Sequence, residues 1–233
     1  MSAKSAPPPL APRLYLATPV IDDPSQVAAR LPALLASADV AAVLLRLSPS
    51  DPRTLISRVK ALAAVIQTAS AALLLDGHAD LVARSGADGA HLTGIAALQE
   101  ALPMLKPDRI AGSGGLSTRH DSMIAGEAGA DSVLFGEPDE AGDRPSTDAI
   151  AERLEWWAEL FEPPCVGYAA SCEEARIFAA SGADFILAGE FVWKDPRGAE
   201  TALAEVAAAI RQGHGLQDGR TTPSPKAEGG AAG

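Results

Sequence analysis

The sequence is poor in cysteine and in aromatic side chains. Its 233 residues include two cysteines, Cys165 and Cys172, and 4% aromatic residues. Two cysteines cannot build a disulfide scaffold, and so few of them are typical of proteins from a reducing compartment. We therefore expect a cytoplasmic protein whose stability comes from a hydrophobic core rather than from covalent cross-links.

Positive charge and long apolar runs are also scarce. The chain has 19 Lys and Arg residues against 30 Asp and Glu residues, which gives a formal net charge of −11. Because nucleic acids and anionic membranes are polyanions, this balance predicts binding to neither. No apolar run reaches the roughly 18 residues that a membrane-spanning helix needs. Residues 1–12 lack the apolar segment of a secretory signal. These absences favour a soluble protein with a small-molecule partner.

The sequence contains a short repeat, the tripeptide Ser-Ala-Asp or Gly-Ala-Asp. Ser-Ala-Asp ending at Asp39 and Gly-Ala-Asp ending at Asp88, Asp131 and Asp184 each precede a short apolar run. The period of roughly 48 residues is long for one strand–helix unit and suits two. We interpret the Gly-Ala-Asp aspartates as turn and cap residues at the amino ends of strands.

The four repeats and the segments between them predict eight strands and eight helices. The expected strands, which are short, apolar and bounded by Gly, Pro, Asp or Ser, are residues 14–18, 40–45, 72–75, 89–92, 109–112, 132–136, 165–169 and 185–189. Segments rich in Ala and Leu with polar residues at helical spacing separate them, at residues 24–36, 51–68, 79–85, 95–105, 117–128, 146–161, 171–181 and 198–212. Eight alternating units in about 200 residues predict a closed (β/α)8 barrel, the TIM barrel of the α/β class.

Both ends of the chain fall outside this pattern. Residues 1–12 are small and rich in proline, and residues 213–233 contain almost no large apolar side chain. Neither segment can bury enough surface to offset its ordering entropy. We therefore predict one domain over residues 13–212, a flexible tail over residues 1–12 and a disordered tail over residues 213–233.

A TIM barrel places its site at the carboxyl ends of its strands. Asp76 and His78 follow the third strand, where an Asp–His pair could exchange protons or merely form a solvated turn. The glycine-rich residues 112–115 could cradle an anion or serve only the backbone geometry of the turn. Four carboxylates follow the sixth strand and could bind a divalent cation or form a solvated loop: Glu137, Asp139, Glu140 and Asp143.

Several stretches resemble a known family. LLLDGHADLVARSGADGAHL, at residues 73–92, is similar to the strand 3 to strand 4 region of thiamine phosphate synthases and the related TenI-type thiazole tautomerases. RLYLATP, EAGADSVLFG and SGADFILAGEFV resemble strands 1, 6 and 8 of the same family. The resemblance spans residues 13–212. It implies a (β/α)8 barrel that joins an aminopyrimidine diphosphate to a thiazole phosphate in thiamine biosynthesis, with Mg²⁺ stabilising the departing diphosphate.

The resemblance also assigns roles to residues. Arg46 matches the family arginine after strand 2 and would contact an anionic substrate. The metal position after strand 3 falls on Gly77, so Asp76 beside it is the candidate Mg²⁺ ligand and, with His78, the candidate catalytic pair. The remaining candidates for binding substrate or phosphate are His91, Ser113, Gly114, Gly115 and Tyr168.

Other family positions carry different residues here. The acidic EPDEAGDR replaces the family's T-x-T-K loop after strand 6, and Gly167-Tyr168-Ala169-Ala170 replaces its I-G-G phosphate loop. Two hypotheses follow: a thiamine phosphate synthase-like transferase with a degenerate site, or a non-catalytic homologue that binds a small phosphorylated metabolite or a protein partner. Trp156 and Trp157 on one predicted helix suggest a homodimer contact.

Overall fold

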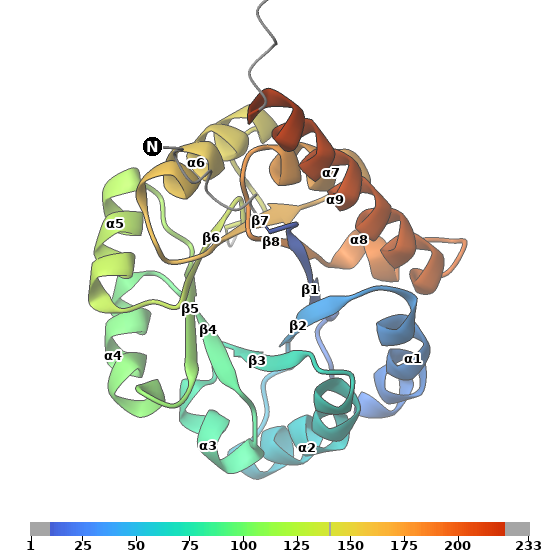
Figure 1. Cartoon of the computed structure of the whole chain (residues 1–233). Coiled ribbons are helices and arrows are strands. Elements are labelled where there is room, and N and C mark those ends of the chain that lie inside the picture. Colours follow the sequence, from blue (N-terminus) through green and yellow to red (C-terminus); the bar gives the residue numbers. More distant parts are fainter. Residues whose placement is uncertain (1–9, 140, 222–233) are drawn as a thin grey trace, which may run out of the picture.

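Eight parallel strands close into one barrel in the order of the sequence, and helices surround it (Figure 1). This computed structural model describes residues 10–139 and 141–221. The predicted TIM barrel is thereby confirmed. The strands are β1 (Arg13–Ala17), β2 (Val40–Leu45), β3 (Ala72–Asp76), β4 (Gly89–Thr93), β5 (Ile110–Gly114), β6 (Ser132–Phe135), β7 (Cys165–Ala169) and β8 (Phe185–Ala188).

The helices follow the strands in alternation, as predicted. They are α1 (Pro24–Ser37), α2 (Pro52–Thr68), η1 (Ala79–Leu81) with α3 (Val82–Ser85), α4 (Ile95–Leu105), α5 (Arg119–Ala128), α6 (Thr147–Leu160), α7 (Cys172–Ala180), α8 (Glu190–Trp193) and α9 (Ala199–Thr221). The sequence did not predict α8, a single turn that follows β8. The Nε1 of Trp193 in this turn donates a 2.8 Å hydrogen bond to the carbonyl of Ala17, which ties α8 to the end of β1.

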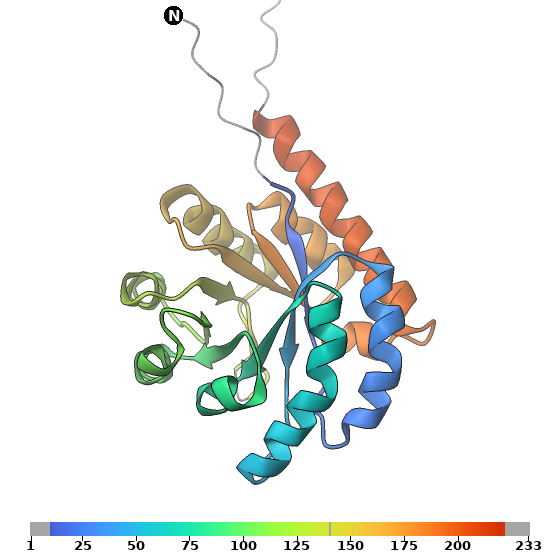
Figure 2. The same cartoon turned by 60° about the horizontal axis from the view of Figure 1, so that its bottom comes forward.

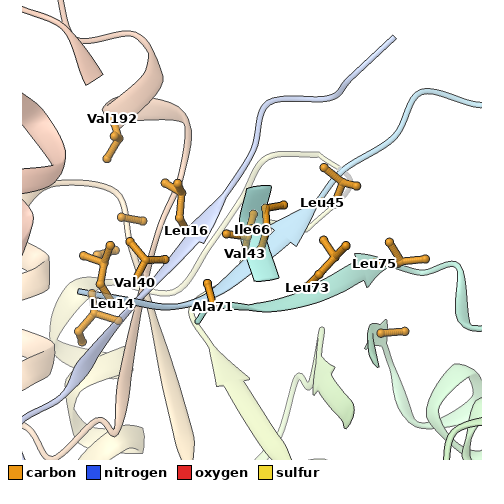
Figure 3. Close-up of a cluster of buried hydrophobic side chains, with 14 of the residues drawn as sticks. Leu14, Leu16, Val40, Val43, Leu45, Ile66, Ala71, Leu73, Leu75 and Val192 are labelled. Atoms are coloured by element: carbon orange, nitrogen blue, oxygen red, sulfur yellow. The ribbon is translucent and has the colours of Figure 1, made fainter. Parts of the chain in front are cut away.

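Side chains alternate between two cores along each strand. Leu14 and Leu16 of β1 point outward and pack with Val43 of β2, Leu73 of β3 and Ile66 of α2 in the core between the strands and the helices (Figure 3). The inner core of the barrel is formed by the alternate residues, which include Tyr15, Leu44, Leu74, Leu134, Val166, Tyr168 and Leu187. This alternation decides which residue at each strand end faces the mouth of the barrel.

The aspartates of the Gly-Ala-Asp repeats form hydrogen bonds between neighbouring strands. The backbone N–H of Leu73 donates a 2.7 Å hydrogen bond to Oδ2 of Asp88, while the N–H of Asp88 donates at 2.8 Å to the carbonyl of Leu73. Asp131 and Asp184 make the same two bonds to Ala111 and Cys165. The repeat is therefore structural and lies at the end of the barrel opposite the carboxyl ends of the strands.

The predicted carboxyl-terminal boundary is wrong. Helix α9 does not end at residue 212 but continues to Thr221, and Figure 2 shows it as one helix running toward the end of the barrel where β1 begins. The cause is close packing: a Cβ atom on Gly213 would lie 2.1 Å from the carbonyl oxygen of Arg176 in α7. The glycine lets the two helices approach closely, and it lies inside α9 rather than at its end. Of the two predicted tails, residues 1–9 and 222–233 lie outside the described residues.

The predicted dimer contact requires both tryptophans of α6 to face outward. Only one of them is partly exposed. Trp157 is fully buried, and its Nε1 donates a 2.6 Å hydrogen bond to the carbonyl of Pro163. Its ring stacks on Phe161 at 4.3 Å between centroids. Trp157 therefore belongs to this chain's own core, and Trp156 alone is left partly exposed. Across residues 10–139 and 141–221, no helix has the length and apolar character needed to cross a membrane.

Candidate functional site

Four charged or titratable side chains meet at the carboxyl-terminal mouth of the barrel. Arg46 follows the inward-facing Leu44 of β2 by two residues, and Asp76 bears the same relation to Leu74 in β3. His91 lies in β4 beside Asp76, its register partner in β3. Glu137 follows β6. The alternation of the strands turns Arg46, Asp76 and His91 toward the same space. Glu137 reaches that space from the turn after β6, where Gly136 adopts φ +86°.

Arg46 and Asp76 form an ion pair, the first of two close pairs of side chains at the mouth. The Nε of Arg46 lies 3.4 Å from Oδ2 of Asp76, and the two side chains are 22% and 31% exposed. The backbone N–H of Arg46 donates to the hydroxyl of Thr18, which fixes the end of β2 against β1. Both side chains therefore keep part of their surface open to solvent, where a ligand can reach them.

His91 and Glu137 form the second pair, which is more deeply buried. The His91 Nε2 lies 3.5 Å from the Glu137 Oε2, and the side chains are 3% and 12% exposed. The backbone N–H of Gly115 also acts on the Glu137 carboxylate and helps to lower its pKa. The glycine turn at the end of β5, proposed from the sequence as an anion cradle, thus holds a carboxylate of the protein itself.

Glu137 is held in its ionised form. Burial acts to raise the pKa of Glu137, but the His91 hydrogen bond and charge, the Arg46 charge and the Gly115 N–H together lower it below its usual value. The carboxylate is therefore a fixed negative charge in the mouth of the barrel.

Tyr15 lies on the inner face of β1, beneath this rim. Its hydroxyl is buried and has no hydrogen-bond partner among the residues that the structure describes. Burial raises the pKa of Tyr15, and the charges of Asp76 and Glu137 raise it further. The hydroxyl therefore keeps its proton and is a hydrogen-bond donor.

A cavity of about 370 Å³ opens on the other side of the mouth, beyond β7 and β8. It is lined by Pro138, Arg144, Tyr168, Ala169, Ala170, Glu190, Phe191 and Lys194. Arg144 is fully engaged there: it donates to the carbonyls of Gly136 and Tyr168 at 3.0 and 2.7 Å and to Glu174 at 2.8 Å. The ammonium group of Lys194 pairs with Glu190, and both side chains are exposed. Of the two cations that line this cavity, Lys194 is the more exposed and the less tightly held.

Comparison with known proteins identifies the family. The family model described as thiamine monophosphate synthase matches residues 14–186. A thiamine-phosphate synthase from Rhodospirillum centenum is 38% identical over 207 residues, which cover 85% of this chain and 98% of the relative. A thiamine-phosphate synthase from Hyphomonas neptunium is 34% identical, over 82% of this chain and 90% of the relative. The chain belongs to the thiamine monophosphate synthase family.

Solved structures agree on the fold. Thiamine phosphate pyrophosphorylase from Pyrococcus furiosus superimposes with a TM-score of 0.71 and 20% identity, over 86% of this chain and 96% of that one. A 3-hexulose-6-phosphate synthase from Salmonella typhimurium gives a TM-score of 0.68 at 16% identity, over 87% and 100% of the two chains. At such identities the likeness is one of fold, and the thiamine monophosphate synthase family is shown by the sequence relatives.

The barrel brings together most of the site residues that the sequence predicted for a thiamine monophosphate synthase-like protein. Arg46, Asp76, His91, Gly114 and Gly115 surround one part of the mouth, and Tyr168 lines the neighbouring cavity.

His78 and Ser113 are placed differently. Within the described part of the chain, the His78 side chain makes no hydrogen bond or ion pair, and Asp76 pairs with Arg46 instead. Ser113 is fully buried and pairs in register with Leu92 and Val133, which belong to the outer core. Strand alternation therefore turns Ser113 toward the helices and away from the mouth.

Sequence reasoning did not single out Glu137 or Tyr15. Glu137 was grouped with the other carboxylates of its loop, although it comes first after the strand. Tyr15 was passed over, although a tyrosine two residues before the small inward residue Ala17 signals an inner-core position. Counting alternate residues along β1 finds Tyr15, whereas Glu137 is turned inward by the turn at Gly136, which strand alternation does not predict.

The acidic residues do not form a preassembled metal centre. Outside the undescribed residues, which include Glu140, no group of three or more His, Cys, Asp or Glu side chains is placed to hold a metal ion. Mg²⁺, however, is commonly bound through one or two carboxylates together with substrate phosphates. The partly exposed Asp76 fits that mode of binding, whereas the loop carboxylates as a cluster do not.

Proposed function

We propose that this protein joins an aminopyrimidine diphosphate to a thiazole phosphate and releases diphosphate. The observation that carries the proposal is the Arg46–Asp76 pair, which is partly exposed at the carboxyl ends of neighbouring strands. A guanidinium binds phosphate oxygens, and a carboxylate beside it can bind the magnesium ion that accompanies a diphosphate. The relatives named thiamine-phosphate synthase support the same reaction.

The chemistry assigns a task to each group. The thiazole ring nitrogen forms a bond to the pyrimidine methylene carbon while the carbon–oxygen bond to diphosphate breaks and its electron pair leaves with the diphosphate. Mg²⁺, when bound, neutralises charge on the departing diphosphate. Asp76 would hold the metal, Arg46 would bind the diphosphate oxygens, and the cavity beside Tyr168 and Lys194 would take the thiazole phosphate.

Turnover of both substrates by the purified full-length chain tests the proposal. With the aminopyrimidine diphosphate, the thiazole phosphate and MgCl₂, we expect equal amounts of thiamine phosphate and diphosphate, and chelation of the metal by EDTA should stop the reaction. Asp76→Asn should raise the Mg²⁺ concentration needed for half-maximal rate. The absence of product at an enzyme concentration equal to that of the substrates would reject the proposal.

A second candidate function is the binding of a phosphorylated metabolite without turnover. Arg144 favours it, because it is the one arginine of the EPDEAGDR loop and its guanidinium already donates hydrogen bonds to Gly136, Tyr168 and Glu174. The loop then offers negative charge where a diphosphate needs positive charge. In the same assay, this function predicts that thiazole phosphate raises the melting temperature while no product forms.

A further inference from the structure

Glu137 differs from the other carboxylates of its loop. Its side chain is 12% exposed and faces the mouth of the barrel, whereas Asp139 and Asp143 are exposed on the loop itself. Oδ1 of Asp139 accepts hydrogen bonds from the backbone N–H groups of Ala141 and Asp143, both at 2.9 Å, and so shapes the loop. The Glu137 carboxylate has no such local role, and its contacts are with β4 and the end of β5.

Those contacts place Glu137 inside the glycine turn that ends β5. A Cβ atom on Gly114 would lie 2.5 Å from the Glu137 Oε2, which itself lies 3.5 Å from the His91 Nε2, and the Gly115 N–H helps to lower the pKa of the carboxylate. Gly115 has φ +63°, the left-handed conformation that glycine adopts without strain. The turn is therefore an anion site whose anion is covalently attached to the protein. The carboxylate fills space beside Gly114 and carries a negative charge, and both disfavour a diphosphate at this turn.

A second polar group points to a ligand at the same place. The Tyr15 hydroxyl is buried without a hydrogen-bond partner among the described residues, and both Asp76 and Glu137 act on it electrostatically. Buried hydroxyls usually find a partner, since leaving one without a partner is costly. The mouth therefore offers a carboxylate acceptor and the Arg46 cation, and a hydroxyl donor without a partner among the described residues lies buried beneath them.

We propose that Glu137 is a specificity-determining residue that excludes diphosphate from the β5 side of the mouth and binds the N–H donors of the aminopyrimidine ring there. An aminopyrimidine carries amino N–H donors and ring nitrogen acceptors, which suit the Glu137 carboxylate and the Tyr15 hydroxyl. The ring then lies toward β5 and its diphosphate toward Arg46 and Asp76. This inference rests on the proposed function, because it orients that reaction's substrate.

Calorimetric titration with two separate probes tests this orientation. The probes are the phosphate-free aminopyrimidine alcohol and sodium pyrophosphate, each titrated into the wild-type full-length chain and its variants. Glu137→Ala should weaken binding of the alcohol at least tenfold. The same variant should tighten pyrophosphate binding at least fivefold, because the Gly115 N–H and His91 become available to an outside anion.

Two further variants separate shape, charge and stability. Glu137→Gln keeps the oxygen that meets the Gly115 N–H, so it should fold like the wild type even if Glu137→Ala does not. It loses the charge, so it should also weaken alcohol binding, by about fivefold. Asp143→Asn removes one negative charge from the exposed part of the same loop and should leave both affinities within twofold of wild type.

The outcomes also distinguish this inference from the proposed function. Binding of the alcohol that depends on Glu137, without turnover of the two substrates, would leave the inference standing and reject the synthase reaction. Turnover of the two substrates with an unchanged affinity for the alcohol in Glu137→Gln would support the synthase reaction and reject the inference about Glu137. A wild-type chain that does not bind the alcohol, or pyrophosphate affinity that falls in Glu137→Ala, would overturn the inference.

Discussion

Gly114 and Glu137 meet across the mouth of the barrel without room for another atom. A Cβ built on Gly114 would lie 2.5 Å from the Glu137 Oε2, and it would lie 2.7 Å from the Nε2 of His91. The glycine is therefore required by the contact between His91 and Glu137 rather than by the turn alone. The end of β5, the histidine of β4 and the carboxylate after β6 form one packed unit.

The first prediction concerns this unit. Gly114→Ala should lower the free energy of unfolding by about 1–3 kcal/mol, the usual cost of inserting a methyl group into a filled site. Urea denaturation monitored by circular dichroism measures the change. Gly215→Ala is the matched control, because a Cβ at that exposed position in α9 meets nothing within 4 Å. It should be neutral or slightly stabilising, since alanine favours helix over glycine. Equal losses in both variants would contradict the packing argument.

The second prediction concerns the carboxylate that holds Arg144. Glu174 accepts 2.8 Å hydrogen bonds from the Arg144 side chain, the Thr147 hydroxyl and the backbone N–H of Ala170. Hydrogen bonds to a charged group contribute about 1.5–3 kcal/mol, so Glu174→Gln should destabilise the protein by an amount in that range. Glu173→Gln changes the neighbouring, exposed carboxylate and should have little effect. Thermal unfolding of the two variants provides the comparison.

The pH dependence of that difference is a third prediction. Burial raises the pKa of Glu174, but its hydrogen bonds and the Arg144 charge outweigh burial and lower the pKa below its usual value. A lowered native pKa gives stability that is present above the unfolded-state value of about 4.3 and is lost as the pH falls through the native pKa. The stability difference between wild type and Glu174→Gln should therefore be full near pH 6 and shrink below pH 4 or so. A constant difference from pH 7 to pH 3 would contradict this assignment.

The barrel could be predicted from the sequence because most of its strands and helices have a recognisable local pattern of apolar residues. Runs such as residues 40–45 and 165–169 are apolar throughout, and α3 and α5 end at Gly86 and Gly129. The α9 boundary failed for a non-local reason: Gly213 packs against α7, and a residue's distant neighbour is not visible in its local pattern.

The site was less predictable, since it depends on the direction of single side chains. Asp76 and His78 are close in sequence, yet Asp76 reaches across to Arg46 on the next strand. Ser113 and Gly114 are adjacent, yet they face opposite sides of β5. Composition shows that the loop after β6 is acidic, but only the closed barrel separates the buried Glu137 from its exposed neighbours.

The fourth prediction tests Arg46 in catalysis. Arg46→Met keeps much of the side-chain volume and removes the charge that we propose binds the diphosphate. Loss of one charged donor to a leaving group typically slows a reaction by about 10²–10³-fold, so kcat/KM should fall by that factor. Steady-state kinetics with the aminopyrimidine diphosphate measures it, and Arg53→Met on the exposed face of α2 is the control. A change in the Arg46 variant no larger than that in the control would remove Arg46 from the site.

The last prediction separates the structural aspartates of the repeat from one another. Asp88→Ala removes the acceptor of the Leu73 N–H and should cost about 1.5 kcal/mol, the contribution of one such bond to stability. Asp88→Asn retains an oxygen in that position and should recover part of the loss. Asp39 occupies the first repeat, but its side chain is 82% exposed and contacts Arg13 alone among the described residues, so Asp39→Ala should change stability little. Denaturant midpoints of the three variants test the order. If Asp39→Ala proved as damaging as Asp88→Ala, the bond to the neighbouring strand would not be the reason for the repeat.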